Sequence, residues 1–345
     1  MRRTWSPAAG RLVDRAPLVF VAVAAALWAG DAYFRPALTR QLSASQIVLV
    51  EDALIALCFI PASLRIRHEL ARLSWRDWLA LATVAVGAQA FATVLFTQSL
   101  TYAFPAGAPP NLNVENEVYL LYLLQPLFGV VLARVVLGER RTPLFWPPAG
   151  VALAGVYLIV FPQDPLVPFS SIQHGQLIAA LLVLGAVFLW ASGTIFGRYA
   201  LSDVSFVTTA AMRFTLALPV LVALNFISHR AEALSGFSTS QVPSFLAIAL
   251  IPGLIAMLLY YRALSKTPAS LATVAELGYP SALFLLFSLP APVGIGAPLR
   301  GVQVVGAVML VTAVTVLNLV RRHGVIRLGG WRARQLAAGR PPSGF

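Results

Sequence analysis

The sequence predicts an all-α membrane protein with ten transmembrane helices, arranged as two inverted five-helix repeats. Of its 345 residues, 59% are hydrophobic and only 11% are charged, which is too few charges to cover a soluble globule of this size. Apolar runs of about 20 residues, the length that spans a bilayer, recur along the chain. The sequence Ala-Leu-Trp-Ala around Trp28 also recurs as Phe-Leu-Trp-Ala around Trp190. The chain therefore divides into two related halves.

Each half contains five expected spans. Because five is odd, the two halves must cross the membrane in opposite senses, a pattern typical of membrane transporters. The runs are long and lack the period-two alternation of a barrel, so we expect helices. The spans are expected at residues 17–35, 45–63, 77–100, 116–138 and 145–162 in the first half, and at 175–197, 205–228, 242–264, 268–289 and 300–320 in the second.

The net charge of +12 indicates membrane orientation rather than nucleic-acid binding. If the N-terminus is cytoplasmic, the inside segments hold 20 of the 25 Lys and Arg residues, as the positive-inside rule requires. Both termini are therefore expected in the cytoplasm, with the basic tail held to anionic lipid headgroups. We expect a cytoplasmic segment, two repeats and a basic cytoplasmic tail at residues 1–16, 17–162, 175–320 and 321–345.

The same motifs follow one another in both halves. A Trp-bearing span comes first, and the fourth span contains Pro126 or Pro280, which are expected to break their helices. In the first half this span ends in Leu-Gly-Glu, with the acid at Glu139. Small residues suited to close helix packing mark the fifth spans, at Gly150, Ala154, Gly301 and Gly306. This order of motifs, over about 300 residues, resembles the EamA family of the drug/metabolite transporter superfamily.

The resemblance implies a secondary transporter of the bacterial inner membrane that exports a small metabolite by alternating access. The stretch from Glu117 to Pro126 is similar to that of bacterial aromatic amino acid exporters, so amino acids or related compounds are the expected cargo. Two departures stand out. Residues 289–293 replace the second Leu-Gly-Glu, and Glu51-Asp52 replaces the arginine that the second half keeps as Arg213.

Charges inside spans are the main candidates for a site, because each costs about 2.5 to 3.5 kcal/mol at mid-bilayer. Arg213 is expected about 12 Å into its span. Its anionic partner would be a substrate carboxylate or one of the acids Glu276, Glu51 and Asp52, the last two pointing about 100° apart. Pro280 is expected to free the backbone carbonyl of Glu276, four residues earlier. A structural ion pair is the competing interpretation for both Arg213 and Glu276.

The full set of expected site residues combines charged and aromatic side chains. The competing interpretations are a solvated mouth for Glu51 and Asp31, helix capping near Asn111 for the start of the fourth span, an ion-paired turn for Glu139, and ordinary packing for the aromatics. Substrate binding is expected from Arg213, Glu276, Tyr122, Glu117, Trp28, Trp190 and Tyr260. Proton coupling is expected from Glu276, Glu51 or Asp31.

We expect no cofactor, no metal and no enzymatic activity. The single cysteine, Cys58, lies in a span, and the four histidines lie in loops or at helix ends. The sequence lacks the G-x-x-x-x-G-K-[ST] motif, so ATP is not expected to drive transport within this chain. The expected partners are a small-molecule substrate and the lipid bilayer; proton coupling and oligomeric state stay open, and a monomer is compatible with the sequence.

Two alternative functions stay open. A sugar-phosphate or nucleotide-sugar transporter would need several converging basic residues. An intramembrane enzyme or lipid-handling protein would need His, Asp or Cys clustered inside the spans. An insertion of ten residues, centred on residues 105–111, is expected on the outer face as a lid or a stiff proline-rich loop.

Overall fold

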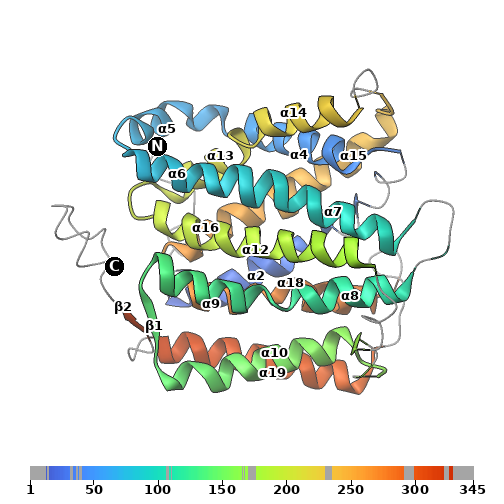
Figure 1. The fold of residues 1–345 in the computed structure, drawn as a ribbon. Coiled ribbons are helices and arrows are strands. Elements are labelled where there is room, and N and C mark those ends of the chain that lie inside the picture. Colours follow the sequence, from blue (N-terminus) through green and yellow to red (C-terminus); the bar gives the residue numbers. More distant parts are fainter. Residues whose placement is uncertain are drawn as a thin grey trace.

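A computed structural model describes most of the chain as a bundle of long helices (Figure 1). The described residues are 13, 15–31, 34–35, 38, 41–105, 109, 111–164, 166, 168–169, 176–229, 235–290, 299–321 and 326–328. Much of the insertion, including residues 106–108 and 110, lies outside this range, and so does most of the tail. The choice between a lid and a stiff loop therefore stays a prediction.

The elements of the first half begin at recognisable caps. Ser43 and Gln46 form a capping box at the start of α4, and the Asn111 side chain caps α8, as the sequence suggests. The elements are α2 (Pro17–Trp28), α4 (Ala44–Cys58), η1 (Ile60–Ala62), α5 (Ser63–Leu70), α6 (Trp75–Ala82), η2 (Thr83–Phe91), α7 (Ala92–Ala103), α8 (Leu112–Tyr122), α9 (Gln125–Val136), β1 (Glu139–Arg141), η3 (Pro143–Phe145) and α10 (Trp146–Val160).

The second half is built in a similar way. The Ser205 side chain caps α13. The elements are α12 (Leu177–Ala200), α13 (Phe206–Thr215), α14 (Leu218–His229), η5 (Thr239–Gln241), α15 (Val242–Ile248), η6 (Ala249–Ile255), α16 (Ala256–Leu264), α17 (Ala269–Ala275), α18 (Gly278–Phe287), α19 (Gly301–Arg321) and β2 (Ile326–Leu328). The two strands pair antiparallel, with Arg140 opposite Arg327.

All ten expected spans coincide with helices, but they are not equally long. Among the described residues, eight helices are long and apolar enough to cross a membrane. A ninth is reached if α4 and the helix after it, which are bent by 44° at their junction, form one span. The helix of the first expected span, α2, has only 12 residues. The count of ten and the inverted layout therefore stay predictions.

The fourth span of each half breaks just before its proline. The helix α8 ends at Tyr122 and α9 begins at Gln125, with Pro126 in its first turn. In the second half, α17 ends at Ala275 and α18 begins at Gly278. The expectation that the Glu276 carbonyl is free is wrong, because it accepts a 3.0 Å hydrogen bond from the Tyr279 backbone N–H. Pro280 has no N–H to donate to this carbonyl, and in the tighter turn the Tyr279 N–H donates instead.

Both third spans contain a π-helical segment. In the first half this segment is η2, between α6 and α7, and in the second half it is η6, between α15 and α16. Such segments are rare and occur often at functional sites. The first of them carries Gln89, a buried amide.

The helices of the two halves pack against each other. The helix α2 packs on α16 and α18, while its counterpart α12 packs on α7, α8 and α9. Further contacts join α4 with α14 and α9 with α17. At the edge of the bundle, α10 and α19 lie side by side (Figure 1). Several helices of the first half thus contact the second half directly.

Glycines allow α10 and α19 to approach closely, though not all the expected ones contribute. A Cβ added to Gly155 would lie 2.6 Å from the Gly306 carbonyl oxygen. The expectation of close packing is wrong for Gly150 and Gly301, where an added Cβ meets nothing within 4 Å. Ala154 is exposed. These three positions lie away from the contact line between the two helices.

This difference predicts opposite effects for two identical substitutions in α10. Gly155→Ala is expected to destabilise the protein by about 1 to 3 kcal/mol, because the new methyl group forces the helices apart. Gly150→Ala is the matched control and is expected to stabilise the helix by about 1 kcal/mol, because alanine is the better helix former. Thermal melting in detergent checks both. Equal melting shifts for the two variants would contradict the packing described here.

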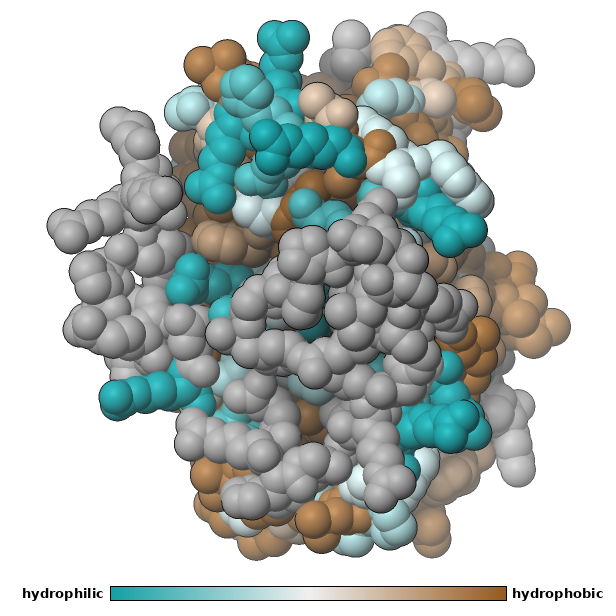
Figure 2. Space-filling view, turned by 90° about the vertical axis from the view of Figure 1, so that its left-hand side faces the viewer, coloured by the Kyte–Doolittle hydropathy of each residue, from teal (hydrophilic) through white to brown (hydrophobic). Residues whose placement is uncertain are grey.

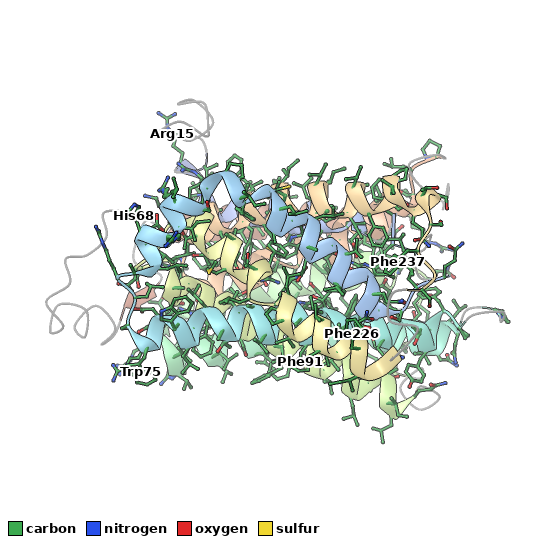
Figure 3. The ribbon with its side chains drawn as sticks, turned by 90° about the horizontal axis from the view of Figure 1, so that it is seen from above. Arg15, His68, Trp75, Phe91, Phe226 and Phe237 are labelled. Carbon is green, nitrogen blue, oxygen red and sulfur yellow. The ribbon has the colours of Figure 1, made fainter. Side chains whose placement is uncertain are left out.

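The surface separates into polar ends and apolar flanks. Figure 2 looks onto the end where α5 and β1 lie, and hydrophilic residues gather there. They include the exposed side chains of Arg65, Arg67, Arg72 and Arg76. Figure 3 shows His68 and Trp75 at this end and Phe237 at the other, with Phe91 and Phe226 between them. Phe91 and Phe226 are exposed, as expected for residues that face lipid.

Candidate functional site

Arg213 lies inside the bundle and is held by polar groups from other helices. Its Nε donates to Gln89 Oε1 at 2.6 Å, and its Nη1 donates to the Tyr261 hydroxyl at 3.2 Å. Its Nη2 donates to the Ala88 carbonyl at 3.4 Å. Gly193 of α12 leaves room for this arrangement, since a Cβ there would collide with that of Ala88. Arg213 is 7% exposed, and its guanidinium faces no carboxylate directly among its described partners.

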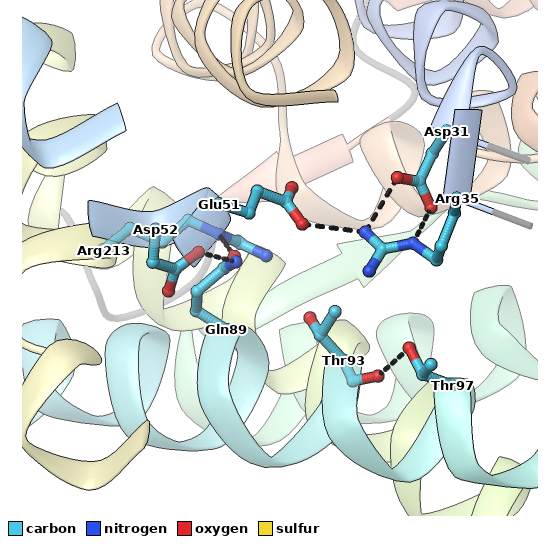
Figure 4. Close-up of polar contacts among 8 residues, drawn as sticks. All are labelled: Asp31, Arg35, Glu51, Asp52, Gln89, Thr93, Thr97 and Arg213. Atoms are coloured by element: carbon cyan, nitrogen blue, oxygen red, sulfur yellow. Dashed lines mark hydrogen bonds and ion pairs between the residues drawn. The ribbon is translucent and has the colours of Figure 1, made fainter. Parts of the chain in front are cut away.

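Gln89 connects Arg213 to Asp52. While its Oε1 accepts from the arginine, its Nε2 donates to Asp52 Oδ1 at 2.8 Å (Figure 4). We call Asp52, Gln89 and Arg213 the polar triad. Asp52 is 0% exposed, and in the described part of the chain its Oδ2 has no hydrogen-bond partner. A carboxylate and a guanidinium are thus both buried and are separated by one amide.

A second charged group lies beside the polar triad. Arg35 forms a two-pronged ion pair with Asp31, at 2.5 and 2.7 Å, and its Nη2 also reaches Glu51 Oε2 at 2.8 Å (Figure 4). We call these three residues the ion cluster. Glu51 is buried, so the expectation of a solvated mouth residue is wrong for it. As their angular separation predicts, Glu51 and the neighbouring Asp52 face different partners.

Glu276 sits at the break between α17 and α18 and is almost completely hydrogen bonded. Its Oε1 accepts from the Tyr260 hydroxyl at 2.6 Å and from Thr194 Oγ1 at 2.8 Å. Its Oε2 accepts from Gln125 Nε2 at 2.5 Å. These donors come from α16, α12 and α9, so one carboxylate ties together helices of both halves. Arg213 lies within electrostatic range of Glu276 but is not one of its hydrogen-bond donors.

Aromatic rings surround these charged groups. Phe96, Tyr122, Trp190 and Tyr279 form an aromatic cluster, with ring centroids 5.0 Å apart for Phe96 and Trp190 and 5.3 Å for Tyr122 and Tyr279. Such distances suit edge-to-face and tilted packing. The Tyr122 hydroxyl lies within electrostatic range of Glu276, and the Tyr279 hydroxyl within range of the ion cluster. The aromatic cluster thus lies between two charged regions.

A second set of rings connects Glu276 with the polar triad. Trp28 packs on Tyr260, with ring centroids 5.2 Å apart, and Tyr260 packs on Tyr261 at 5.3 Å. Since Tyr260 binds Glu276 and Tyr261 binds Arg213, the two tyrosines join both buried charges. The Trp28 Nε1 and the Gln125 Oε1 are buried without a hydrogen-bond partner in the described part of the chain.

Glu117 lies apart from these groups. Its Oε2 accepts from the Gln176 backbone N–H at 3.1 Å, at the start of α12. Its described contact therefore fixes a helix end at the junction of the two halves. A role in substrate binding stays a prediction for this residue.

Glu139 does more than form the expected ion-paired turn. It pairs with Arg141 at 2.7 Å and also accepts from the Ala269 backbone N–H at 2.9 Å and from Ser270 Oγ at 2.5 Å. The carboxylate therefore caps the start of α17, where the helix dipole favours a negative charge. Burial lowers the pKa of the Arg141 guanidinium, and the Glu139 charge opposes that shift.

Several residues of the site were not expected from the sequence. Arg35, the last residue of the first expected span, was not among the expected site residues, although its position four residues after Asp31 is a helical pairing signal. Gln89 and Gln125 are uncharged amides in apolar spans, which is a weaker signal. Nothing in the sequence distinguishes Thr194 and Tyr261 from other residues inside the spans. In the described ranges, no three His, Cys, Asp or Glu side chains are grouped in a way that could hold a metal ion.

The long apolar helices form a bundle, and its interior holds charged and hydrogen-bonded side chains. This combination defines a multi-pass membrane protein. Residues 177–319 match the EamA-like transporter family. Together with a transporter relative that matches most of the sequence, this match supports the resemblance to the EamA family that the motifs predict. Both comparisons point to a small-molecule membrane transporter.

Two similar proteins extend this comparison. The relative is the riboflavin transporter ImpX of Fusobacterium nucleatum subsp. nucleatum, which is 29% identical over 303 residues. The match covers 86% of this chain and 95% of that protein. One solved crystal structure of a protein has the same fold, with a TM-score of 0.64 and 18% identity, over 90% of this chain and 99% of that one.

Proposed function

We propose that this protein moves a small planar aromatic metabolite across the bacterial inner membrane by alternating access, and that riboflavin is its first candidate substrate. The observation that carries the proposal is the aromatic cluster between two charged regions. A flavin ring is flat and aromatic, and its edge presents carbonyl and N–H groups. Ring contacts contribute about 0.5 to 1.5 kcal/mol each beyond area burial. The similarity to a riboflavin transporter supports this choice.

Polar side chains around the cluster would orient such a ring. Glu276 with its donor Tyr260 would face the edge of the substrate, and Arg213 would contact a substrate oxygen. Trp28 Nε1 and Gln125 Oε1 each leave one hydrogen-bonding position unused among the described residues. Buried polar groups are normally paired, so these two atoms are suited to a ligand.

An aromatic amino acid is the second candidate, and for this cargo export is the expected direction. The observation that favours it is the set of partners of Arg213, which are an amide, a hydroxyl and a backbone carbonyl. A substrate carboxylate would give this guanidinium the anion that it lacks. A sugar phosphate is less well supported, because Arg35 already binds two carboxylates.

The packing of the halves supports alternating access. The contacts of α2 with α16 and those of α12 with α7 are the pairs that exchange under a two-fold relation of the repeats. The exposed arginines at the end shown in Figure 2 support a cytoplasmic location for that end and, with the charge distribution of the sequence, for both termini.

Transport by the purified protein in liposomes tests the proposal. We expect riboflavin, followed by its fluorescence, to enter the vesicles and to raise the melting temperature of the protein. Trp190→Ala is expected to weaken binding by about tenfold or more, since it removes stacking area from the aromatic cluster. Trp146→Ala, at an exposed tryptophan of α10, is the matched control and should bind as the wild type does.

The outcomes separate the two candidates. Tyrosine or phenylalanine transport without riboflavin transport would replace the first candidate by the second. Riboflavin binding that is equally strong in Trp190→Ala and in wild type would contradict the role of the aromatic cluster.

A further inference from the structure

The buried acids of the bundle differ in how their charge is compensated. Glu276 accepts three hydrogen bonds, from Tyr260, Thr194 and Gln125. Asp31 and Glu51 both bind the Arg35 guanidinium directly. Each of these acids has partners that stabilise its ionised form. The sequence predicts them as proton carriers, and each has a hydrogen-bond or ion-pair donor that opposes its protonation.

Asp52 is the exception among these acids. It is 0% exposed, and its one described hydrogen bond comes from the neutral amide of Gln89 at 2.8 Å. Its second oxygen, Oδ2, is buried without a partner among the described residues. An ionised carboxylate with so few donors is costly in an apolar interior, and such a group takes up a proton instead. Its unpartnered oxygen is the atom that would carry that proton.

The charged groups around Asp52 make its protonation consequential. Within electrostatic range are Glu51 on the same helix, Arg213 on α13, and Arg35 of the ion cluster. Glu51 repels a negative charge on Asp52, but Arg35 neutralises Glu51 directly. Gln89 lies between Arg213 and Asp52, and its hydrogen bond to the arginine holds the guanidinium in position. The charge of Asp52 therefore acts on Arg213 as well as on Glu51, and Gln89 connects it to the arginine.

We propose that Asp52 is the binding site of a coupling proton and that Gln89 positions Arg213 to respond to it. When Asp52 is ionised, its negative charge opposes the attraction of Arg213 for an electron-rich substrate oxygen. When Asp52 gains a proton on Oδ2, that opposition is removed and Arg213 binds the substrate more strongly. By linkage, bound substrate also strengthens proton binding at Asp52. Proton and substrate therefore cross together.

The π-helical segment η2 gives this coupling a structural basis. Gln89 lies within it, and the adjacent Ala88 provides the carbonyl that accepts from Arg213. A π-helix departs from the regular α-helical hydrogen-bond pattern, and such segments are frequent at functional sites. A rearrangement of η2 during transport would move both contacts of Arg213 together.

The inference rests on the proposed transport function, and the experiment keeps the two apart. Riboflavin accumulation is measured in liposomes with a pH difference of about one unit across the membrane. Wild-type protein is expected to concentrate riboflavin in the more alkaline compartment, up to about tenfold for one proton per substrate. Asp52→Asn is expected to equilibrate riboflavin without concentrating it, and its exchange of internal for external riboflavin should persist. Asp52→Glu, which keeps the carboxyl group, should restore accumulation at least in part.

Control measurements decide between the remaining outcomes. Asp164→Asn removes an exposed acid in a loop and should accumulate riboflavin as the wild type does. Accumulation by Asp52→Asn equal to that of the wild type would overturn the proposal while leaving transport intact. Accumulation driven by a sodium gradient and not by a pH difference would also overturn it.

A spectroscopic measurement tests Asp52 without any substrate. Infrared difference spectra between acidic and alkaline pH should show the C=O stretch of a protonated carboxyl group in the wild type. That band should be lost in Asp52→Asn and kept in Asp164→Asn. If the band persists in Asp52→Asn, another group binds the proton, whatever the substrate proves to be.

Discussion

Arg213→Ala is expected to abolish concentrative transport and to destabilise the protein by about 3 to 5 kcal/mol. The substitution removes three hydrogen bonds and leaves Gln89 Oε1 without its donor. It also removes the positive charge that Gln89 connects to Asp52 within the polar triad. Melting of the purified protein in detergent and riboflavin flux in liposomes measure the two effects separately.

Two variants show whether the position of the charge matters. Arg213→Lys keeps the charge, but a single ammonium group cannot reproduce the planar donor set that contacts Gln89 and Tyr261, so transport should stay low. Arg134→Ala removes an exposed arginine at the end of α9 and should leave both measurements unchanged. Wild-type flux in Arg213→Ala would show that the substrate binds elsewhere.

Glu276→Gln is expected to reduce riboflavin flux by about 5- to 150-fold, because an unmet buried donor or acceptor costs about 1 to 3 kcal/mol. Glutamine has the size of glutamate, but its NH₂ group replaces one of the two oxygens. The new NH₂ group then faces either the Gln125 NH₂ or the hydroxyls of Tyr260 and Thr194, which are themselves donors to the carboxylate. Initial flux at several substrate concentrations separates weaker binding from slower movement.

Smaller changes around the same carboxylate provide a graded comparison. Tyr260→Phe removes one donor to Glu276 and should have a smaller effect than Glu276→Gln, because Thr194 still donates to the same oxygen. If Tyr260→Phe reduced transport more than Glu276→Gln, the tyrosine would act on the substrate directly and not through the carboxylate.

The positions of the helices could be predicted because composition and apolar length determine them. Every expected span contains a helix, and both fourth spans break beside their proline. The short α2 and the 44° bend after α4 could not be predicted, because an apolar run does not reveal where the backbone turns. The π-helical segments were also beyond reach, since no residue pattern in the sequence marks the wider turn.

The candidate site was predictable only in part, for a related reason. Charges inside spans are visible in the sequence, and Arg213, Glu276 and Asp52 could therefore be found. Their partners depend on which helices meet, and the Gln89 contacts join residues 37 and 124 positions away. Arg35 was overlooked because an arginine at the end of an expected span looks like an interface residue. No pattern in the sequence therefore showed that the uncharged amide of Gln89 connects Asp52 with Arg213.

The two π-helical segments have a consequence for how this chain can be aligned. A π-helical turn holds more residues than an α-helical turn, so each third span contains more residues than a regular helix of the same length. An alignment that treats residues 75–103 as one uniform helix would assign the wrong facing to the side chains beyond η2, including Phe96. Comparisons of third spans among relatives should therefore be made by superposing backbones, with a gap allowed inside η2 and inside η6.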